Sequence, residues 1–217
     1  MSKAKKLTNI AAMAAIGLVI NLVSAKSFPA IGRPSLVYGF CYISGIVIGP
    51  VNGMIAAIIS DIAGYFLSPI EAPYVPQITL ANGLMALTSG LLYKHLKFKR
   101  KELSIIVTAL ICFPLLTLGL AAWGEAVILL DLKPNWYVLA LSMGEKTGIK
   151  NKFLMVAMQK AITQPVWIAL NVLIAVPFVK RLSKIKQHFI ESLLSFKAEI
   201  DGSKEKNPPS PTDDNCA

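Results

Sequence analysis

The chain has 217 residues; 54% of them are hydrophobic, only 16% are charged, and the formal net charge is +10. Charged residues make up about a quarter of a typical soluble domain, so this composition predicts an integral membrane protein. The sequence contains no Walker motif, zinc-binding spacing or nucleophile elbow, and only two histidines, which argues against the common enzyme classes. We therefore expect a protein that is not an enzyme, without catalytic residues or a metal site.

Six apolar runs follow one another along the chain, several of them near the roughly 20 residues that cross a bilayer as a helix. The second run is short and closes at Gly49 and Pro50, where a tight turn is expected before the third run. The third run is stopped by Pro69. We predict an all-α integral membrane protein with six transmembrane helices, at residues 7–24, 35–49, 51–67, 79–92, 103–130 and 151–179.

An even number of spans places both termini on one side, and the basic residues predict which side that is. Twelve Lys and Arg residues fall on the side of the termini and six on the other side, which puts the termini in the cytoplasm by the positive-inside rule. Anionic headgroups of the lipid bilayer account for the net charge without any nucleic acid. The twelve are at positions 3, 5, 6, 94, 97, 99, 100, 101, 180, 181, 184 and 186, and the six at 26, 33, 133, 146, 150 and 152.

The two ends of the chain carry separate expectations. The basic start, the first apolar run and the sequence VSA at 23–25 also resemble a cleavable signal peptide, but its removal would leave five spans and put the basic C-terminus outside. Apolar residues at helical spacing in 183–200 predict an amphipathic helix on the inner membrane surface. The polar residues 201–217 are expected to be a disordered cytoplasmic tail, so the membrane domain is 1–182.

Two opposite charges stand at matching depth inside the predicted spans. Asp61 is eight residues before Pro69, about 12 Å from the outer end of its helix, and Lys160 is nine residues after Asn151, about 13 to 14 Å deep. Charges inside spans usually face the bundle interior, where they pair with one another or mark a substrate path. Two interpretations remain open: a structural Asp61–Lys160 ion pair, or a ligand cavity faced by one or both charges. The two are compatible, because a ligand could insert between them.

Other polar and aromatic residues gather toward the same outer end. Tyr65 follows Asp61 by one helical turn, and Trp123 and Glu125 lie near the outer end of the fifth run. Trp and Tyr at these depths also occur as interfacial belt residues. The pattern predicts a ligand pocket in the outer half of the membrane, lined by Asp61, Tyr65, Lys160, Arg33, Gln77, Thr79, Asn82, Trp123 and Gln164.

A family resemblance rests on the first run and the central block. Ala11 and Ala15 are spaced to let another helix approach closely. With the six-span layout and the block GPVNGMIAAIISDIAGYFLSP…YVPQITLANGLMALTSGLLYK, they resemble the S components of energy-coupling factor (ECF) vitamin transporters. The turn at Gly49, Asp61 and the Thr79 motif PxxTL are most similar to the folate-specific branch. The resemblance covers about residues 7–180.

The resemblance implies a high-affinity vitamin-binding subunit in the membrane of a prokaryotic cell. Such a subunit binds its vitamin outside and docks through Ala11 and Ala15 onto a transmembrane coupling (T) subunit. Two cytoplasmic ATPase subunits then drive release inward, so ATP is used by the partners and this chain needs no cofactor. Alternatives of another class are a secondary carrier, which the lack of an evident inverted repeat disfavours, and a membrane-embedded enzyme using Asp61 and Glu125.

Folate would use the residue types available. A carboxylate such as Asp61 could hold the aminopyrimidine edge of a pterin in paired hydrogen bonds, and Tyr65 or Trp123 could stack on its ring. The two carboxylates of the glutamate tail would seek basic side chains. Pantothenate, which would need Asp61 less, or a pyridoxine-type compound are alternative vitamins. The candidate basic side chains for the tail are Lys160, Arg33, Lys150 and Lys152.

Overall fold

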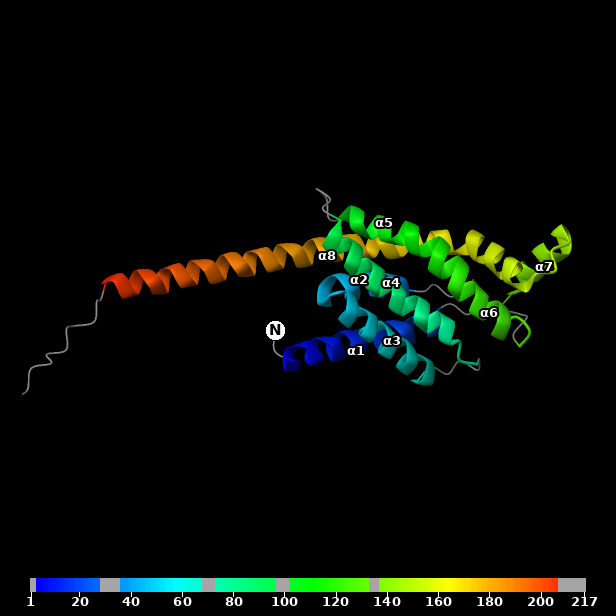
Figure 1. Ribbon diagram of the computed structural model, residues 1–217, viewed down its shortest axis with the longest axis horizontal. Helices are drawn as coiled ribbons and strands as arrows, with labels where there is room; N and C mark the ends of the chain where they lie inside the picture. The colour runs from blue at the N-terminus through cyan, green and yellow to red at the C-terminus, as the bar shows by residue number, and fades with distance from the viewer. Residues whose placement is uncertain (1–2, 28–35, 68–72, 97–101, 133–136, 207–217) are drawn as a thin grey trace, which may run out of the picture. The chain divides into compact units, whose positions relative to one another are not determined.

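The computed structural model describes residues 3–27, 36–67, 73–96, 102–132 and 137–206, with side chains described up to residue 181. The chain divides into two compact units, Met1–Val179 and Lys180–Ala217. All regular secondary structure in the described residues is helical (Figure 1). The helices are α1 Lys3–Ser27, α2 Val37–Ile48, α3 Pro50–Leu67, α4 Pro76–His95, α5 Glu102–Cys112, the π-helix η1 Phe113–Ala121, α6 Ala122–Ile128, α7 Val138–Thr147 and α8 Lys152–Lys206.

Each predicted apolar run coincides with a helix, and the fifth run is shared by α5, η1 and α6. Among the described residues, four helical stretches are long and apolar enough to cross a membrane: Lys6–Ser24, Pro50–Leu67, Leu103–Ile128 and Lys152–Arg181. The apolar helix α2 is shorter, and α4 does not meet the same criteria. The all-helical membrane fold is therefore confirmed, whereas six full-length spans are not. Helix α7 lies in a segment where no helix was predicted.

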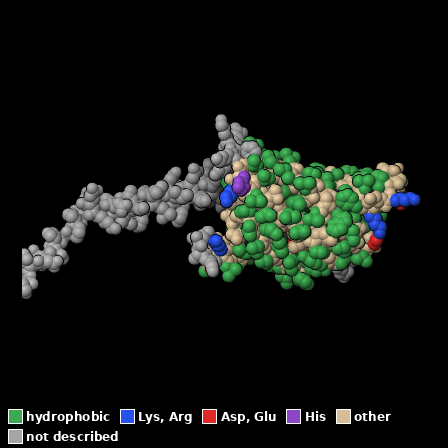
Figure 2. Space-filling view, viewed as in Figure 1, with side chains coloured by type: hydrophobic (Ala, Val, Ile, Leu, Met, Phe, Trp, Pro, Cys, Tyr) green, Lys and Arg blue, Asp and Glu red, His purple; other side chains and the backbone are tan. Residues whose placement is uncertain are grey.

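Hydrophobic side chains cover most of the first unit's visible surface, and charged side chains gather at its ends (Figure 2). The exposed residues include Val51, Phe66, Leu115, Val166 and Leu173, which are 60 to 76% exposed. Such a surface is unfavourable in water because it leaves a large apolar area unburied. It suits contact with lipid chains, and it agrees with the membrane location predicted from composition.

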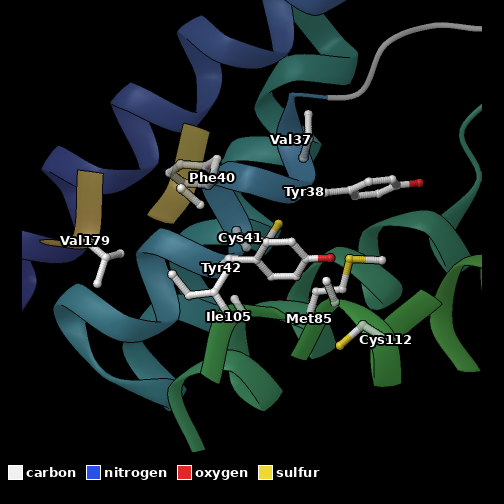
Figure 3. Close-up of a cluster of buried hydrophobic side chains, with 13 residues drawn as sticks. Val37, Tyr38, Phe40, Cys41, Tyr42, Met85, Ile105, Cys112 and Val179 are labelled. Atoms are coloured by element: carbon white, nitrogen blue, oxygen red, sulfur yellow. The ribbon is translucent and has the colours of Figure 1, made fainter. Parts of the chain in front are cut away.

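The interior of the first unit is built around α2, α3 and α4. Helix α3 packs against α1, α2 and α4, and α4 also packs against α5 and η1 (Figure 1). The buried side chains of one apolar cluster surround Tyr42 on α2, with Met85 of α4, and Ile105 and Cys112 of α5 close by (Figure 3). A second apolar cluster joins Val75 to α6, the start of α7 and the first turns of α8.

Glycines let α2 and α4 approach more closely than side chains would allow. A Cβ on Gly45 would lie 1.9 Å from the Ala86 carbonyl oxygen, and one on Gly90 would lie 2.5 Å from the Gly45 carbonyl oxygen. These contacts fix α2 against α4. Gly49 has a φ of +92° and links α2 to α3, which confirms the predicted turn, because only glycine adopts this conformation easily.

The two ends of the chain differ from their predictions in part. Helix α1 packs on α3 and α2, and Asn21 Nδ2 donates a hydrogen bond to the Ser60 carbonyl at 3.2 Å, so α1 is part of the membrane bundle. At the other end α8 continues to Lys206. Residues 201–206, which were predicted to be disordered, are therefore helical. The expectation for 207–217 lies outside the described residues, and the surface location of 183–200 stays a prediction.

Candidate functional site

Asp61 lies on α3 and is held by two side chains of α4. The Thr79 hydroxyl donates to Asp61 Oδ2, and Asn82 Nδ2 donates to Oδ1 at 3.0 Å. Thr79 and Asn82 are both buried. The Tyr74 hydroxyl in turn donates to Thr79 Oγ1 at 2.7 Å, so a chain of hydrogen bonds leads from Tyr74 to the carboxylate. These three neighbours are neutral donors, and charge-assisted bonds of this kind stabilise a carboxylate in an apolar environment.

Of the two interpretations left open for Asp61 and Lys160, the ion pair is wrong, because Lys160 pairs with a different acid. Lys160 Nζ on α8 lies 2.8 Å from Glu125 Oε1 on α6, and the two side chains are only 9% and 15% exposed. Asp61 and Lys160 were matched by depth along their helices. Depth alone does not say which way a side chain points around the helix, and Glu125 reaches the same level from a third helix.

Tyrosine hydroxyls that sequence reasoning missed complete the surroundings of this ion pair. The Tyr137 hydroxyl donates to Glu125 Oε2 at 3.1 Å, so both oxygens of the carboxylate are engaged. Tyr38 on α2 is buried, and its ring extends away from Phe40 in Figure 3. No sequence motif marks these tyrosines. Their positions near the starts of α2 and α7 become informative only once those starts are known.

Helix α7 is tied to the same site at its first turn. The backbone N–H of Ala140 donates to Gln159 Oε1 at 3.0 Å, and Tyr137 immediately precedes the helix. Gln159 neighbours Lys160 on α8, so the start of α7 is bonded both to α8 and, through Tyr137, to Glu125. The bond to Gln159 satisfies one of the backbone donors left unpaired at a helix start.

Two predicted site residues carry buried acceptors that lack a partner. The side-chain carbonyl oxygens of Gln77 and Gln164 are buried and accept no hydrogen bond from the described part of the chain. Gln77 opens α4 and packs against Gly124, next to Glu125, while Gln164 lies one turn after Lys160 on α8. Buried acceptors without donors are rare and costly in native proteins, so these two are suited to receive donors from a ligand.

Of the remaining predicted site residues, one lies near Asp61 and the others lie elsewhere or outside the described residues. Tyr65 stacks near Asp61 against Tyr74, with ring centroids 5.1 Å apart. Trp123 does not join the cluster: it is 51% exposed on the apolar surface, on the opposite side of α6 from Glu125. Arg33 lies outside the described residues. Ala11 and Ala15, predicted to be a docking surface, are exposed on α1.

The described residues therefore form two polar clusters: Asp61 with its donors on α4, and the Glu125–Lys160 pair with Tyr137. The ammonium and one carboxylate neutralise each other, and the second carboxylate is held by neutral donors. No group of three or more potential metal ligands occurs in the part of the chain that the structure describes. The arrangement can bind a small polar molecule by hydrogen bonds and ring contacts.

One family model matches the chain, over residues 1–184, and it describes the S component of an ECF-type riboflavin transporter. The match is to the riboflavin type and not to a folate-specific family. No individual curated protein matches the sequence significantly. Because the matched region covers most of the chain, the chain belongs to the S component family of ECF transporters, and it is a multi-pass cell-membrane subunit that binds a transported substrate, not an enzyme.

Proposed function

We propose that this S component binds a flavin, with riboflavin as the first candidate, on the outer side of the membrane and delivers it to an energising module. Riboflavin is an uncharged molecule with a flat ring system, one imide N–H and a chain of hydroxyl groups. The observation that carries this proposal is the Glu125–Lys160 ion pair at 2.8 Å. It leaves the buried ammonium neutralised, so the site has little to offer a ligand with several negative charges.

The ion pairs of the lysines also argue against folate as the ligand, because its glutamate tail carries two carboxylates. Four cations were candidates for the glutamate tail. Lys160 is paired with Glu125, and Lys152 is paired with Asp131 at 2.5 Å. Lys150 is exposed, and Arg33 lies outside the described residues. Moving two carboxylates into the membrane beside these pairs would leave them poorly compensated. The same argument disfavours pantothenate, which is an anion. A neutral vitamin needs no free cation.

The polar and aromatic side chains suit the parts of a flavin. Gln77 and Gln164 provide buried carbonyl acceptors that receive no hydrogen bond from the described residues, and ribityl hydroxyl groups could donate to them. Asp61 could accept the imide N–H in a charge-assisted bond. The Tyr65–Tyr74 pair provides ring surface beside that carboxylate, and aromatic rings prefer offset or tilted contacts of this kind.

Folate remains the second candidate because one observation favours it. Both oxygens of Asp61 accept hydrogen bonds from α4, and Tyr65 follows Asp61 by one turn of α3 and contacts Tyr74. A carboxylate beside an aromatic ring can recognise an aminopyrimidine edge. The pterin half of folate could therefore bind as the flavin ring would. The physical difference between the two ligands that matters here is the charged glutamate tail of folate, which riboflavin lacks.

The test is a fluorescence titration of the purified, detergent-solubilised protein with riboflavin. Quenching of the flavin emission should be saturable, with one site per chain. Folate and pantothenate in large excess should not restore the emission, whereas excess lumiflavin, which has the ring without the hydroxyl chain, should compete weakly. Displacement of riboflavin by folate at similar concentration, or the absence of saturable quenching with folate bound instead, would overturn the flavin proposal.

A further inference from the structure

The helix that carries Glu125 is interrupted by a π-helical segment. Helix α5 ends at Cys112, η1 runs from Phe113 to Ala121, and α6 follows without a break. At the exit the N–H of Ala122 bonds to the carbonyl oxygens of Gly119 and Thr117. A π-helix bonds i to i+5, so each of its residues turns through a smaller angle than in an α-helix. Such segments are rare and often lie at functional sites.

The helix buries residues before and after this segment that one continuous α-helix would place on opposite faces. Before it, Cys112 is 1% exposed and faces the interior. Ala121 comes nine residues later, which is about two and a half α-helical turns, so an unbroken α-helix would place it on the opposite face. In the structure Ala121 is also buried, at 4% exposure. The π-helical segment has therefore turned the following helix by about half a turn.

This rotation decides the direction of Glu125. Glu125 follows Ala121 by four residues and shares its inward face, where it meets Lys160. Trp123 and Val127 are 51% and 61% exposed. An α-helix continued from Cys112 would reverse this pattern: Trp123 and Val127 would face inward and Glu125 would face lipid.

We propose that η1 is a positioning element of the vitamin site, which turns Glu125 from the lipid side toward Lys160 and so keeps the buried ammonium neutralised. The proposal rests on the proposed function for the meaning of the site, but the rotation is a property of the helix itself. Both an acid facing lipid and an unpaired buried ammonium are unfavourable in a membrane. The pairing of the two offsets the poorer hydrogen-bond geometry of a π-helix. Pro114, which lacks an N–H donor, favours departure from the α pattern at the start of the segment.

Two variants that change the length of η1 distinguish an effect on the direction of Glu125 from a general loss of folding. Removing Leu118 and Gly119 shortens the segment by about half an α-helical turn, so an α-helix can join the same two faces. We expect the riboflavin affinity of this variant to lie within about threefold of that of the full-length chain. Adding Glu125→Gln should lower the riboflavin affinity of the deletion variant and of the full-length chain by the same factor. Inserting two alanines after Gly119 is the matched control. It should turn Glu125 away, weaken binding at least about tenfold and abolish any further effect of Glu125→Gln.

A deletion variant whose affinity no longer depends on Glu125, or an insertion variant that binds as tightly as the full-length chain, would overturn the proposal. If either variant fails to fold, nitroxide labels on the full-length chain decide. In a Cys216→Ala background, where the remaining Cys41 and Cys112 are buried, labels at positions 123 and 127 should be accessible to oxygen dissolved in lipid. Protected labels at both positions would contradict the rotation. This measurement needs no vitamin, so it fails or succeeds independently of the flavin proposal.

Discussion

Asp61 is a carboxylate inside a membrane helix whose described partners are neutral. Thr79 and Asn82 donate to its two oxygens, yet each oxygen retains a second lone pair. A charged group near the centre of a span costs about 2.5 to 3.5 kcal/mol on insertion scales. The residue is therefore expected to do more than hold α3 against α4, because two hydrogen bonds from neutral donors compensate a buried charge only in part.

Asp61→Asn tests this expectation directly. If the carboxylate accepts a charge-assisted hydrogen bond from the vitamin, the substitution should weaken binding by about 1.5 to 3 kcal/mol, roughly ten- to a hundredfold. The melting temperature should fall only modestly, because the amide oxygen still accepts one of the two hydrogen bonds from α4. Riboflavin titration and thermal unfolding of the same preparation give both quantities. Leu80→Ala, at an exposed position of α4, is the control for a substitution on that helix. A large loss of melting temperature with unchanged affinity would assign Asp61 a structural role.

The buried ion pair makes a second prediction at the scale of single residues. Glu125→Gln leaves the Lys160 ammonium buried without a counter-charge, which typically costs about 3 to 5 kcal/mol. Adding Lys160→Gln removes the uncompensated charge and should restore much of the melting temperature. The matched control is the Asp131–Lys152 pair, whose side chains are 62% and 53% exposed. Asp131→Asn should cost no more than about 1 kcal/mol. Equal losses for the two acids would contradict the burial argument.

Counting residues from the helix ends estimated the depth of the polar side chains in the membrane, but it did not identify the ion-pair partner of Lys160. Helix rise per residue is nearly constant, so counting estimates depth along a helix, but the meeting of Asp61, Lys160, Gln77 and Gln164 in one pocket stays a prediction. The partner of Lys160 was missed because pairing depends on rotation about the helix axis. That rotation is set for Glu125 by η1, and a nine-residue π-helix leaves no reliable signal in a sequence that is apolar on all sides.

At the scale of helices, the apolar runs predicted position well and length less well. Helix α2 has only 12 residues, about 18 Å, against a hydrocarbon core of about 30 Å. Its start depends on tertiary contacts: the Gly39 N–H donates to Asn171 Oδ1 of α8 at 2.8 Å. A helix boundary fixed by a residue more than a hundred positions away cannot be derived from local propensity. The same holds for α7, whose first turn is bonded to Gln159.

The exposed face of α1 carries a prediction about partner recognition. Replacing Ala11 and Ala15 with Trp adds bulk where small residues permit close helix approach, so vitamin uptake and association with the T subunit should be lost. Riboflavin affinity of the isolated chain should stay within about twofold, because both positions are exposed. Uptake by cells and co-purification of the T subunit are the measurements. Leu173→Trp, at a position on α8 that is 71% exposed, controls for added bulk on a lipid-facing surface. Unchanged uptake with both alanines replaced would refute the docking role.

For the whole molecule, membership of the S component family predicts binding without pumping. The purified chain in proteoliposomes should bind riboflavin but should not concentrate it, even with a proton or sodium gradient. Addition of the T subunit and both ATPase subunits with ATP should produce concentrative uptake. Radiolabelled riboflavin retained after filtration measures both states, with a nucleotide-free sample as the control. Gradient-driven accumulation by the chain alone would favour the secondary-carrier alternative.

The helices of the first unit also differ in apolar length, which has a mechanical consequence. The span Pro50–Leu67 has 18 residues and Lys152–Arg181 has 30, about 27 Å and 45 Å when measured along the helix axis. A bilayer of one thickness cannot match both, so the surrounding lipid must thin, thicken or let helices tilt. Thicker membranes would then strain the neighbourhood of α3, and thinner ones the longer helix. A change in lipid composition that alters bilayer thickness therefore improves the hydrophobic match of one of these spans and worsens the match of the other.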